Sequence, residues 1–530
     1  MNARIPELTA FLRSVPMAMA LALALAGCGG GGDGGPSASY GQEDEATSAP
    51  TSLPVTIKNN SGRTVYVNIT GDSSKPFVVT PATTATIDAG MSATFNVAQL
   101  SAGRIYLSYD KALSSNAPDG ANSKDPDYRT RFDKIEITYS QGAGGKANLT
   151  AVDFYAIPLL LETSIQGTVI EHLTLETGQS GHGLRTAITN VIGAANEDKA
   201  VVKSTVAPVE VVRVLSPVKR PEAYGSFDTF LGTLKNSSTF DIAGNYFGTT
   251  SQSYHYTGTF DDTEIKLSNG THKIVVSRAS LAYSATDLIN HNGIYTCNGP
   301  FTVDGVPHSE ADNDIYAAVY RDLVTGFNLG FVTTGANTSS TWWTSTAFPP
   351  NSGGDYYYNA YARVVADNYP GAYGFPFSDR YRQVLADLGG KIDALTITVQ
   401  ADDTLAPPYS PQGTVNPQSG PAGSPTFNLS LQTSDSNFNL TSFTFDTQSY
   451  QGGNGYNFPT TPSPFAVPGN AAAINYIPTQ DGLNIYTLEL RGRRYSVLAK
   501  VSNGIVNWAS IAGGANGIYT APTLYVGGLN

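Results

Sequence analysis

Charged residues, cysteine and tryptophan are scarce in this sequence. Only 14% of its 530 residues are Asp, Glu, Lys or Arg, and it contains two cysteines and three tryptophans. The formal net charge of −12 offers no basic face for the release of counterions from phosphates, which argues against nucleic acid and anionic lipid headgroups as partners. Neutral substrates suit this composition better.

Glycine and aromatic residues are abundant instead. The sequence includes 54 Gly, 30 Tyr and 22 Phe, a composition typical of all-β exported proteins and not of helical cytosolic enzymes. A chain of this length exceeds one ordinary hydrophobic core, so two or three folded units are expected.

The N-terminus has the pattern of a lipoprotein signal peptide. Arg4 and Arg13 flank the start of the segment, a short apolar run follows, and residues 25–28 read LAGC, which is a lipobox. The run is too short to span a bilayer as a helix of the mature chain. We therefore expect residues 1–28 to direct export and Cys28 to be acylated. The alternative is an ordinary signal peptide in which Cys28 is incidental.

The segment after the lipobox, residues 29–52, cannot bury enough apolar surface to fold and should form a flexible tether. Gly29 rather than aspartate follows the cysteine, which favours the outer membrane of a bacterial cell envelope. Lipid anchoring there is the expectation, and secretion is the alternative. Because the anchor would use Cys28, Cys297 would have no intrachain disulfide partner, and packing alone would stabilise the mature chain.

The central region, residues 53–402, is dominated by patterns of short β-strands. Val55 and Ile57 alternate with polar residues, as in a half-buried strand. Apolar residues instead recur three and four apart, the helical period, in residues 183–192 and 226–234. Further strands are expected at residues 65–69, 93–97, 105–108, 135–139, 152–156, 256–265, 273–277, 315–320, 359–365 and 391–399. The fold class that these patterns indicate is mainly β, a barrel or sandwich with a mixed α/β subdomain.

The C-terminal region differs in composition. Residues 403–424 combine proline with glycine and serine and should form a linker. Beyond them, Asn503 and Gly504 lie between two alternating apolar segments, which is the strongest short hairpin signal. We therefore expect residues 425–530 to form a separate all-β module.

Two acidic residues on neighbouring predicted strands are the candidates for chemistry. Alternation places Glu136 and Thr138 on one face of the first strand, and Asp153 and Tyr155 on one face of the second. Residues 141–146 between them are glycine-rich and suit a hairpin. Diagonal neighbours across such a hairpin lie about 7 to 8 Å apart, and inverting glycosidases hold their two carboxyl groups about 6.5 to 9.5 Å apart. The pattern permits a catalytic pair, although an acidic residue on a strand is usually a solvated one.

The remaining polar clusters indicate no metal and no cofactor. The six histidines show no metal-ligand spacing. Asp312 and Asp314 lack the glycine and glutamate of a calcium loop, and Ser180 lacks the final glycine of a nucleophile elbow. Trp342 and Trp343 could stack on sugar rings, although core packing is the commoner fate of such residues.

A series of short segments adds a family resemblance to this pattern. They are residues 53–63 (LPVTIKNNSGR), 103–109 (GRIYLSY), 125–138, 152–158 (VDFYAIP), 212–217 (VRVLSP), 256–258 (YTG), 294–297 (IYTC) and 372–379 (AYGFPFSD). In this order they resemble glycoside hydrolase family 64, whose members are β-1,3-glucanases. The resemblance extends from about residue 53 to residue 402.

The resemblance implies an activity and a fold. Glu136 would be the general acid and Asp153 the general base of an endo-acting, inverting hydrolysis of β-1,3-glucan, such as laminarin or curdlan. The implied fold is a thaumatin-like β barrel or sandwich joined to a mixed α/β subdomain, with a wide cleft between them. No cofactor is implied, and we expect a monomer. The residues expected to bind substrate are Thr138, Tyr155, Trp342, Trp343 and Asp379.

The chain departs from the family pattern close to the candidate pair. Lys134 stands where the family often has tryptophan, Ile137 stands where an aromatic residue is usual, and the loop between the two carboxyl groups is one residue longer. The family counterpart of Cys297 pairs with a later cysteine, whose place is taken here by Ala317. A second interpretation therefore stays open, a non-catalytic, glucan-binding, thaumatin-like surface lipoprotein.

Overall fold

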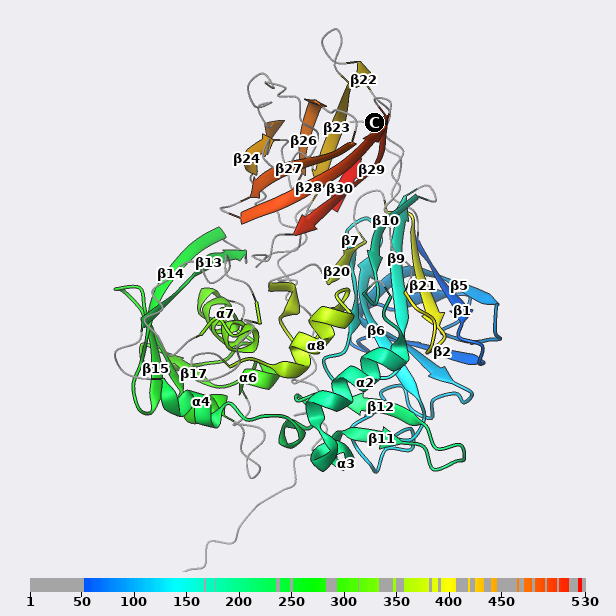
Figure 1. Ribbon diagram of the computed structural model, residues 1–530, viewed down its shortest axis with the longest axis horizontal. Coiled ribbons are helices and arrows are strands. Elements are labelled where there is room, and N and C mark those ends of the chain that lie inside the picture. The colour runs from blue at the N-terminus through cyan, green and yellow to red at the C-terminus, as the bar shows by residue number, and fades with distance from the viewer. Residues whose placement is uncertain are drawn as a thin grey trace, which may run out of the picture.

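The computed structural model describes residues 52–406, with gaps at 166–167, 177, 235–238, 248–250, 283–292, 313, 333–346, 349–356, 381–383 and 389–391, together with strands beyond residue 418 (Figure 1). Cys28, Trp342 and Trp343 lie outside the described residues, as do the signal peptide and the tether.

The larger part of the fold is one strongly curved sheet of 12 strands, ordered β10-β9-β21-β1-β5-β6-β7-β19, with β2, β3, β4 and β20 on its branches (Figure 1). Its strands are β1 (Leu53–Asn60), β2 (Val65–Thr70), β3 (Val78–Thr80), β4 (Thr84–Ile87), β5 (Ser92–Tyr109), β6 (Phe132–Ser140), β7 (Gly144–Thr150), β9 (Leu159–Ile165), β10 (Thr168–Leu173), β19 (Ala372–Tyr373), β20 (Leu385–Asp387) and β21 (Ala394–Gln400).

Strand β5 bends the sheet because its two halves pair with different strands. The first half pairs with β1 and the second half with β2, so two strands expected at residues 93–97 and 105–108 are one 18-residue strand. The register with β6 shifts between Leu100 and Gly103, as at a β-bulge. A Cβ on Gly103 would lie 2.8 Å from the carbonyl oxygen of Ile137, so the bend requires glycine.

A smaller layer of helices and strands packs on the same hydrophobic core. It consists of α2 (Gly181–Ile192), η1 (Ala194–Asn196), α3 (Glu197–Ala200), η2 (Pro221–Ala223) and the sheet β11-β12-β8, whose strands are β11 (Val201–Lys203), β12 (Val211–Leu215) and β8 (Phe154–Tyr155). Leu184 and Ile188 of α2 are fully buried in that core. The helix predicted over residues 183–192 is confirmed.

The mixed α/β subdomain has a second hydrophobic core. Its antiparallel sheet runs in the order β13-β14-β15-β16-β17-β18. Its elements are α4 (Asp228–Thr233), β13 (Thr239–Phe247), β14 (Ser251–Phe260), β15 (Glu264–Ser268), β16 (Lys273–Ser277), α5 (Arg278–Leu281), α6 (Gly293–Thr296), β17 (Phe301–Val303), β18 (Val306–His308), α7 (Ile315–Leu329) and η4 (Ser378–Arg380). Helix α8 (Ala360–Asn368) joins the two cores, because Tyr361 packs in the first and Ala362 in the second (Figure 1).

Three predicted strands of this region are wrong, and of these the one over residues 256–265 is divided by the turn between β14 and β15. Residues 315–320 and 359–365 form the helices α7 and α8. Both helices have a capping side chain, since Asp314 accepts a hydrogen bond from the Ala317 amide and Asn359 accepts one from the Ala362 amide. A short apolar run fits a buried helix as well as a strand, and the caps were the distinguishing signal. The helix predicted over residues 226–234 is confirmed as α4.

The strands beyond residue 418 form two further sheets, ordered β22-β23-β26-β25, with β30 paired to β23, and β24-β27-β28-β29. They are β22 (Gln418–Ser419), β23 (Pro425–Gln432), β24 (Leu440–Phe445), β25 (Phe465–Ala466), β26 (Ala471–Pro478), β27 (Gly482–Leu490), β28 (Arg493–Ser502), β29 (Ile505–Gly513) and β30 (Thr523–Val526). Ser502 pairs with Ile505, so β28 and β29 form the predicted hairpin, and Asn503 and Gly504 between them lie outside the described residues. The mainly β fold class, with its mixed α/β subdomain and all-β C-terminal region, is confirmed.

The chain remains attached to the barrel beyond residue 402. The amide of Ala406 donates to the carbonyl of Gln179 over 2.8 Å, and the amide of Gly178 donates to the carbonyl of Ala406 over 2.8 Å. The side chain of Ala406 is buried. Residues 403–406 therefore belong structurally with α2, although the sequence places them in the predicted linker.

Candidate active site

One face of β5, β6 and β7 carries a band of polar side chains, which we call the polar face. Arg104, Glu136 and Asn148 lie side by side across the three strands. On the opposite face of β6, Ile135 and Ile137 are buried in the barrel core. The alternation predicted for this strand is therefore confirmed, and it directs Glu136 away from the core.

Glu136 is largely enclosed on the polar face, with 15% of its side chain exposed. The Nε atom of Arg104 lies 3.8 Å from its Oε1 atom, and Asn148 is its neighbour on strand β7. Burial raises the pKa of Glu136 above its ordinary value, and the field of Asp153 acts in the same direction, against Lys134 and Arg104. This environment favours the protonated carboxyl that a general acid needs.

Asp153 reaches the polar face by a different route from the one predicted. The strand expected over residues 152–156 is wrong, because only Phe154 and Tyr155 form a strand, and they pair with β12 in another sheet. Asn148 is the cross-strand neighbour of Glu136. Asp153 lies in the bend beyond the end of β7, with 13% of its side chain exposed.

Hydrogen bonds to neighbouring segments hold this bend in place. The Asp133 carboxylate accepts from the amides of Ala156 (2.9 Å) and Ile157 (3.0 Å), and the amide of Ser216 donates to the carbonyl of Asp153 (3.0 Å). The backbone on both sides of the Asp153 side chain is thus fixed to β6 and to the turn that follows β12.

Two lysines contact the Asp153 carboxylate, one on each oxygen. Lys134 of β6 bonds to Oδ2, and Lys219 lies 3.1 Å from Oδ1. Burial alone would raise the pKa of Asp153, but Lys134 and Lys219 hold it well below its ordinary value. There is therefore a pH range in which Asp153 is ionised while Glu136 is protonated.

The predicted substrate-binding residues lie in different environments. Thr138 is exposed on the polar face, two residues from Glu136, and accepts a hydrogen bond of 3.2 Å from the Ala102 amide. Tyr155 is buried in the core against the ring of Tyr369 and is not presented to solvent, so its assignment as a substrate-binding residue does not fit. Asp379 is partly exposed in η4. Trp342 and Trp343 lie outside the described residues.

Sequence reasoning missed the basic and amide side chains of the site. Arg104, Lys219 and Asn148 contact the two carboxyl groups, yet they come from segments far from one another along the chain. Lys134 was noticed only as a departure from the family pattern. The available signal was its place on the same face of β6 as Glu136. The Asn148 amide oxygen is buried and has no hydrogen-bond partner among the described residues, so it could accept from a sugar hydroxyl.

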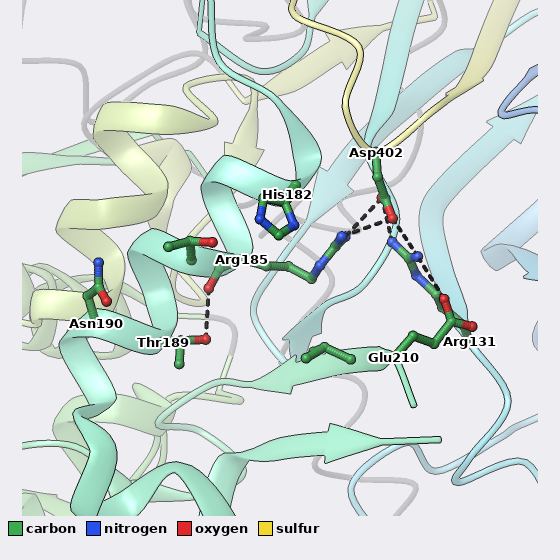
Figure 2. A pocket seen from close by; sticks show the side chains of 9 residues that line it. Arg131, His182, Arg185, Thr189, Asn190, Glu210 and Asp402 are labelled. Atoms are coloured by element: carbon green, nitrogen blue, oxygen red, sulfur yellow. Dashed lines mark hydrogen bonds and ion pairs between the residues drawn. The ribbon is translucent and has the colours of Figure 1, made fainter. Parts of the chain in front are cut away.

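Two adjoining pockets, of about 400 and 450 Å³, meet at Asp402, and neither is lined by Glu136 or Asp153. Figure 2 shows Arg131 and Arg185 converging on the Asp402 carboxylate in the first pocket. Glu210 lies 3.7 Å from Arg131. The charges of this network are already matched by one another, and it ties the end of β21 to α2.

Among the described residues, no group of three or more His, Cys, Asp or Glu side chains is placed to hold a metal ion. Within the same part of the chain, no helix is long and apolar enough to cross a bilayer.

The electrostatics of the two carboxyl groups indicate a class of protein. Two carboxyl groups at one polar face, one with its pKa raised and the other with its pKa lowered, have the opposite protonation preferences of an acid–base pair. The sequence model of glycoside hydrolase family 64, described as β-1,3-glucanase, matches residues 55–399. The chain belongs to this family and is a glycoside hydrolase that acts on β-1,3-glucan.

Solved structures of similar proteins were found as well. A laminaripentaose-producing β-1,3-glucanase in complex with laminaritetraose is 20% identical, covers 67% of this chain and 100% of its own, and has a TM-score of 0.45. A β-1,3-glucanase domain from Clostridium beijerinckii is 15% identical, with the same two coverages and a TM-score of 0.44. A laminaripentaose-producing enzyme from Paenibacillus barengoltzii with laminarihexaose is 16% identical, covers 67% and 76%, and has a TM-score of 0.38. The family assignment rests on the sequence model. No curated protein matched the chain.

Proposed function

We propose that this protein cleaves β-1,3-glucan within the chain by a single displacement that inverts the anomeric carbon. Glu136 donates a proton to the departing glycosidic oxygen, and Asp153 accepts a proton from the attacking water. The observation that carries this proposal is the opposite displacement of the two pKa values on one polar face. In this proposal Thr138 and the amide oxygen of Asn148, which has no hydrogen-bond partner among the described residues, bind substrate hydroxyls.

The test is incubation of the full-length protein with laminarin and curdlan, with a β-1,4-glucan as the control polymer. We expect new reducing ends from the two β-1,3-glucans, a mixture of oligosaccharides at early times, and an α-anomer as the first product by proton NMR. Glucose alone at early times would refute internal cleavage. An initial β-anomer would refute the single displacement.

A second candidate is a glucan-binding protein without hydrolytic activity. The contacts of Lys134 and Lys219 with both oxygens of Asp153 favour it, because a paired carboxylate is a weaker base. Retention of laminarin on the protein without release of reducing ends would support this candidate and refute the enzyme.

We further propose that Cys28 carries a lipid that anchors the protein to the outer membrane of a bacterial cell envelope, with residues 29–52 as the tether. The lipobox at residues 25–28 and the glycine that follows it support this proposal.

A further inference from the structure

The contact between Asp153 and two lysines is unusual for a residue that must accept a proton from water. Each ammonium group occupies one carboxylate oxygen. The side chain of Lys134 is 9% exposed, and that of Lys219 is 32% exposed. A strongly hydrated ammonium group is seldom buried unless a carboxylate compensates its charge, so the two lysines and Asp153 form one electrostatic unit.

The backbone gives this unit a fixed geometry. Lys134 belongs to the central strand β6. Lys219 belongs to a tight turn in which the amides of Lys219 and Arg220 donate to the carbonyl of Ser216, over 3.0 and 2.9 Å. The amide of Ser216 in turn donates to the carbonyl of Asp153. Both ammonium groups are therefore anchored independently of substrate.

We propose that Lys134 and Lys219 are positioning residues, which clamp the Asp153 carboxylate in one orientation and keep it ionised beside a protonated Glu136. The inference rests on the proposed function, since it assigns Asp153 the task of activating water.

The two lysines have separable effects. Lys134 lowers the pKa of Asp153 and also that of Glu136, whereas Lys219 acts on Asp153. The other charged or titratable groups that face this unit are Arg104 and Tyr106 of β5, Asp119, which acts on Lys219, and Tyr361 of α8, on which Asp153 acts. None of these described groups adds a third cation to the two that contact Asp153.

The experiment measures kcat and KM for laminarin against pH in the full-length protein and in Lys134→Met and Lys219→Met. A contacting cation lowers the pKa of a carboxyl by about 1 to 3 units. Each variant should therefore shift the acid limb of the pH–rate profile to higher pH by that amount. Lys134→Met should also shift the alkaline limb to higher pH, because Lys134 lowers the pKa of Glu136. Lys219→Met should leave the alkaline limb at its wild-type pH. A loosened base should lower kcat by about 10- to 100-fold with a smaller change in KM.

Matched variants separate the clamp from a merely structural role. Lys134→Arg keeps the charge, so both limbs should lie at their wild-type pH values. Lys58→Met removes an exposed charge from β1 of the same sheet and should behave as the wild type. If Lys134→Met fails to fold, Lys219→Met decides the matter, because its side chain is partly exposed. Variants that lose rate but keep both limbs at their wild-type positions would overturn the proposal.

A second measurement does not depend on hydrolysis. In protein labelled with carbon-13 at the aspartate carboxyl carbon, the Asp153 resonance is assigned by its loss in Asp153→Asn. It should titrate at a higher pH in either methionine variant than in the wild type. An unchanged titration would overturn the clamp even in an active enzyme, whereas an inactive wild type with a shifted titration would refute only the proposed function.

Discussion

The backbone amide of Ala156 donates a hydrogen bond of 2.9 Å to the carboxylate of Asp133. Asp133 precedes Lys134 in β6, and Ala156 lies three residues after Asp153, so this bond ties together the two segments that carry the carboxyl pair. Complete burial raises the pKa of Asp133 to about 6, against the hydrogen bonds that it accepts from the backbone. One buried side chain therefore positions the site and also contributes to the pH dependence of stability.

The first prediction follows from the sign of that shift. Because the pKa of Asp133 is raised on folding, its contribution to stability is present below its unfolded pKa, near 4, and is lost as the pH rises through about 6. Asp133→Asn should remove this dependence, on the order of 1 to 3 kcal/mol. Urea unfolding across this range measures it, with Asp88→Asn as the exposed control. A variant with the same slope as the wild type would contradict this account of Asp133.

Asp402 should show the opposite pH dependence. Partial burial opposes its ionisation, but hydrogen bonds from Arg131 and Arg185 lower the pKa of Asp402 to about 2. The stability that it contributes is therefore present above about pH 4 and is lost as the pH falls toward 2.

Asp402→Asn should lower the free energy of unfolding at neutral pH by about 1 to 3 kcal/mol, because it leaves buried guanidinium groups without their carboxylate. Asp403→Asn, at the exposed neighbouring position, is the matched control and should change little. Equal thermal unfolding temperatures for the two variants would show that the Asp402 network does not stabilise the fold.

Alternation along the sequence correctly predicted the face of β6 on which Glu136 lies, because it does not depend on which strands pair with β6. The helical period also predicted α2 correctly, and the alternation of the flanking segments predicted the pairing of β28 with β29. Local patterns of this kind predict the structure correctly where tertiary packing does not oppose them.

Long-range partners explain what the sequence could not provide. The route by which Asp153 reaches Glu136 depends on pairing between β8 and β12, about 60 residues apart along the chain. Alternation predicts Tyr155 on the same face as Asp153, but the pairing of β8 with β12 buries its side chain in the core. Lys219 contacts Asp153 because the turn after β12 brings it there, and no local signal in the sequence indicates this turn's position.

The C-terminal region provides a third prediction. A chain that ends after Ala406 keeps the hydrogen bonds to Gly178 and Gln179 and should hydrolyse laminarin at the wild-type rate. Its retention on insoluble curdlan should be weaker, because a tethered module that binds polysaccharide raises the effective concentration at the site. The measurements are reducing-end release and a curdlan pull-down.

A second truncation makes this test decisive. A chain that ends after Gln400 also loses Asp402, and it should unfold at a lower temperature than the chain that ends after Ala406. If the chain that ends after Ala406 is itself insoluble or inactive, the C-terminal region belongs to the catalytic fold and the predicted boundary is wrong.

The fourth prediction concerns the anchor. Cys28→Ser removes the sulfur that an acyl chain would modify, and buried acyl methylene groups would provide the membrane affinity. The variant should therefore move from the detergent phase to the aqueous phase in detergent partitioning of cell extracts. Identical partitioning of the variant and the wild type would refute lipidation at Cys28.

The most direct measurement of the central claim is the rate of laminarin hydrolysis by Glu136→Gln and Asp153→Asn. Each substitution keeps the shape of the side chain and removes its ability to transfer a proton, so each should reduce kcat by at least about 100-fold. Thermal unfolding temperature and laminarin binding should remain close to the wild type, and Glu176→Gln, at an exposed position, should keep full activity. Turnover near the wild-type rate in either active-site variant would contradict the assignment of that residue to catalysis.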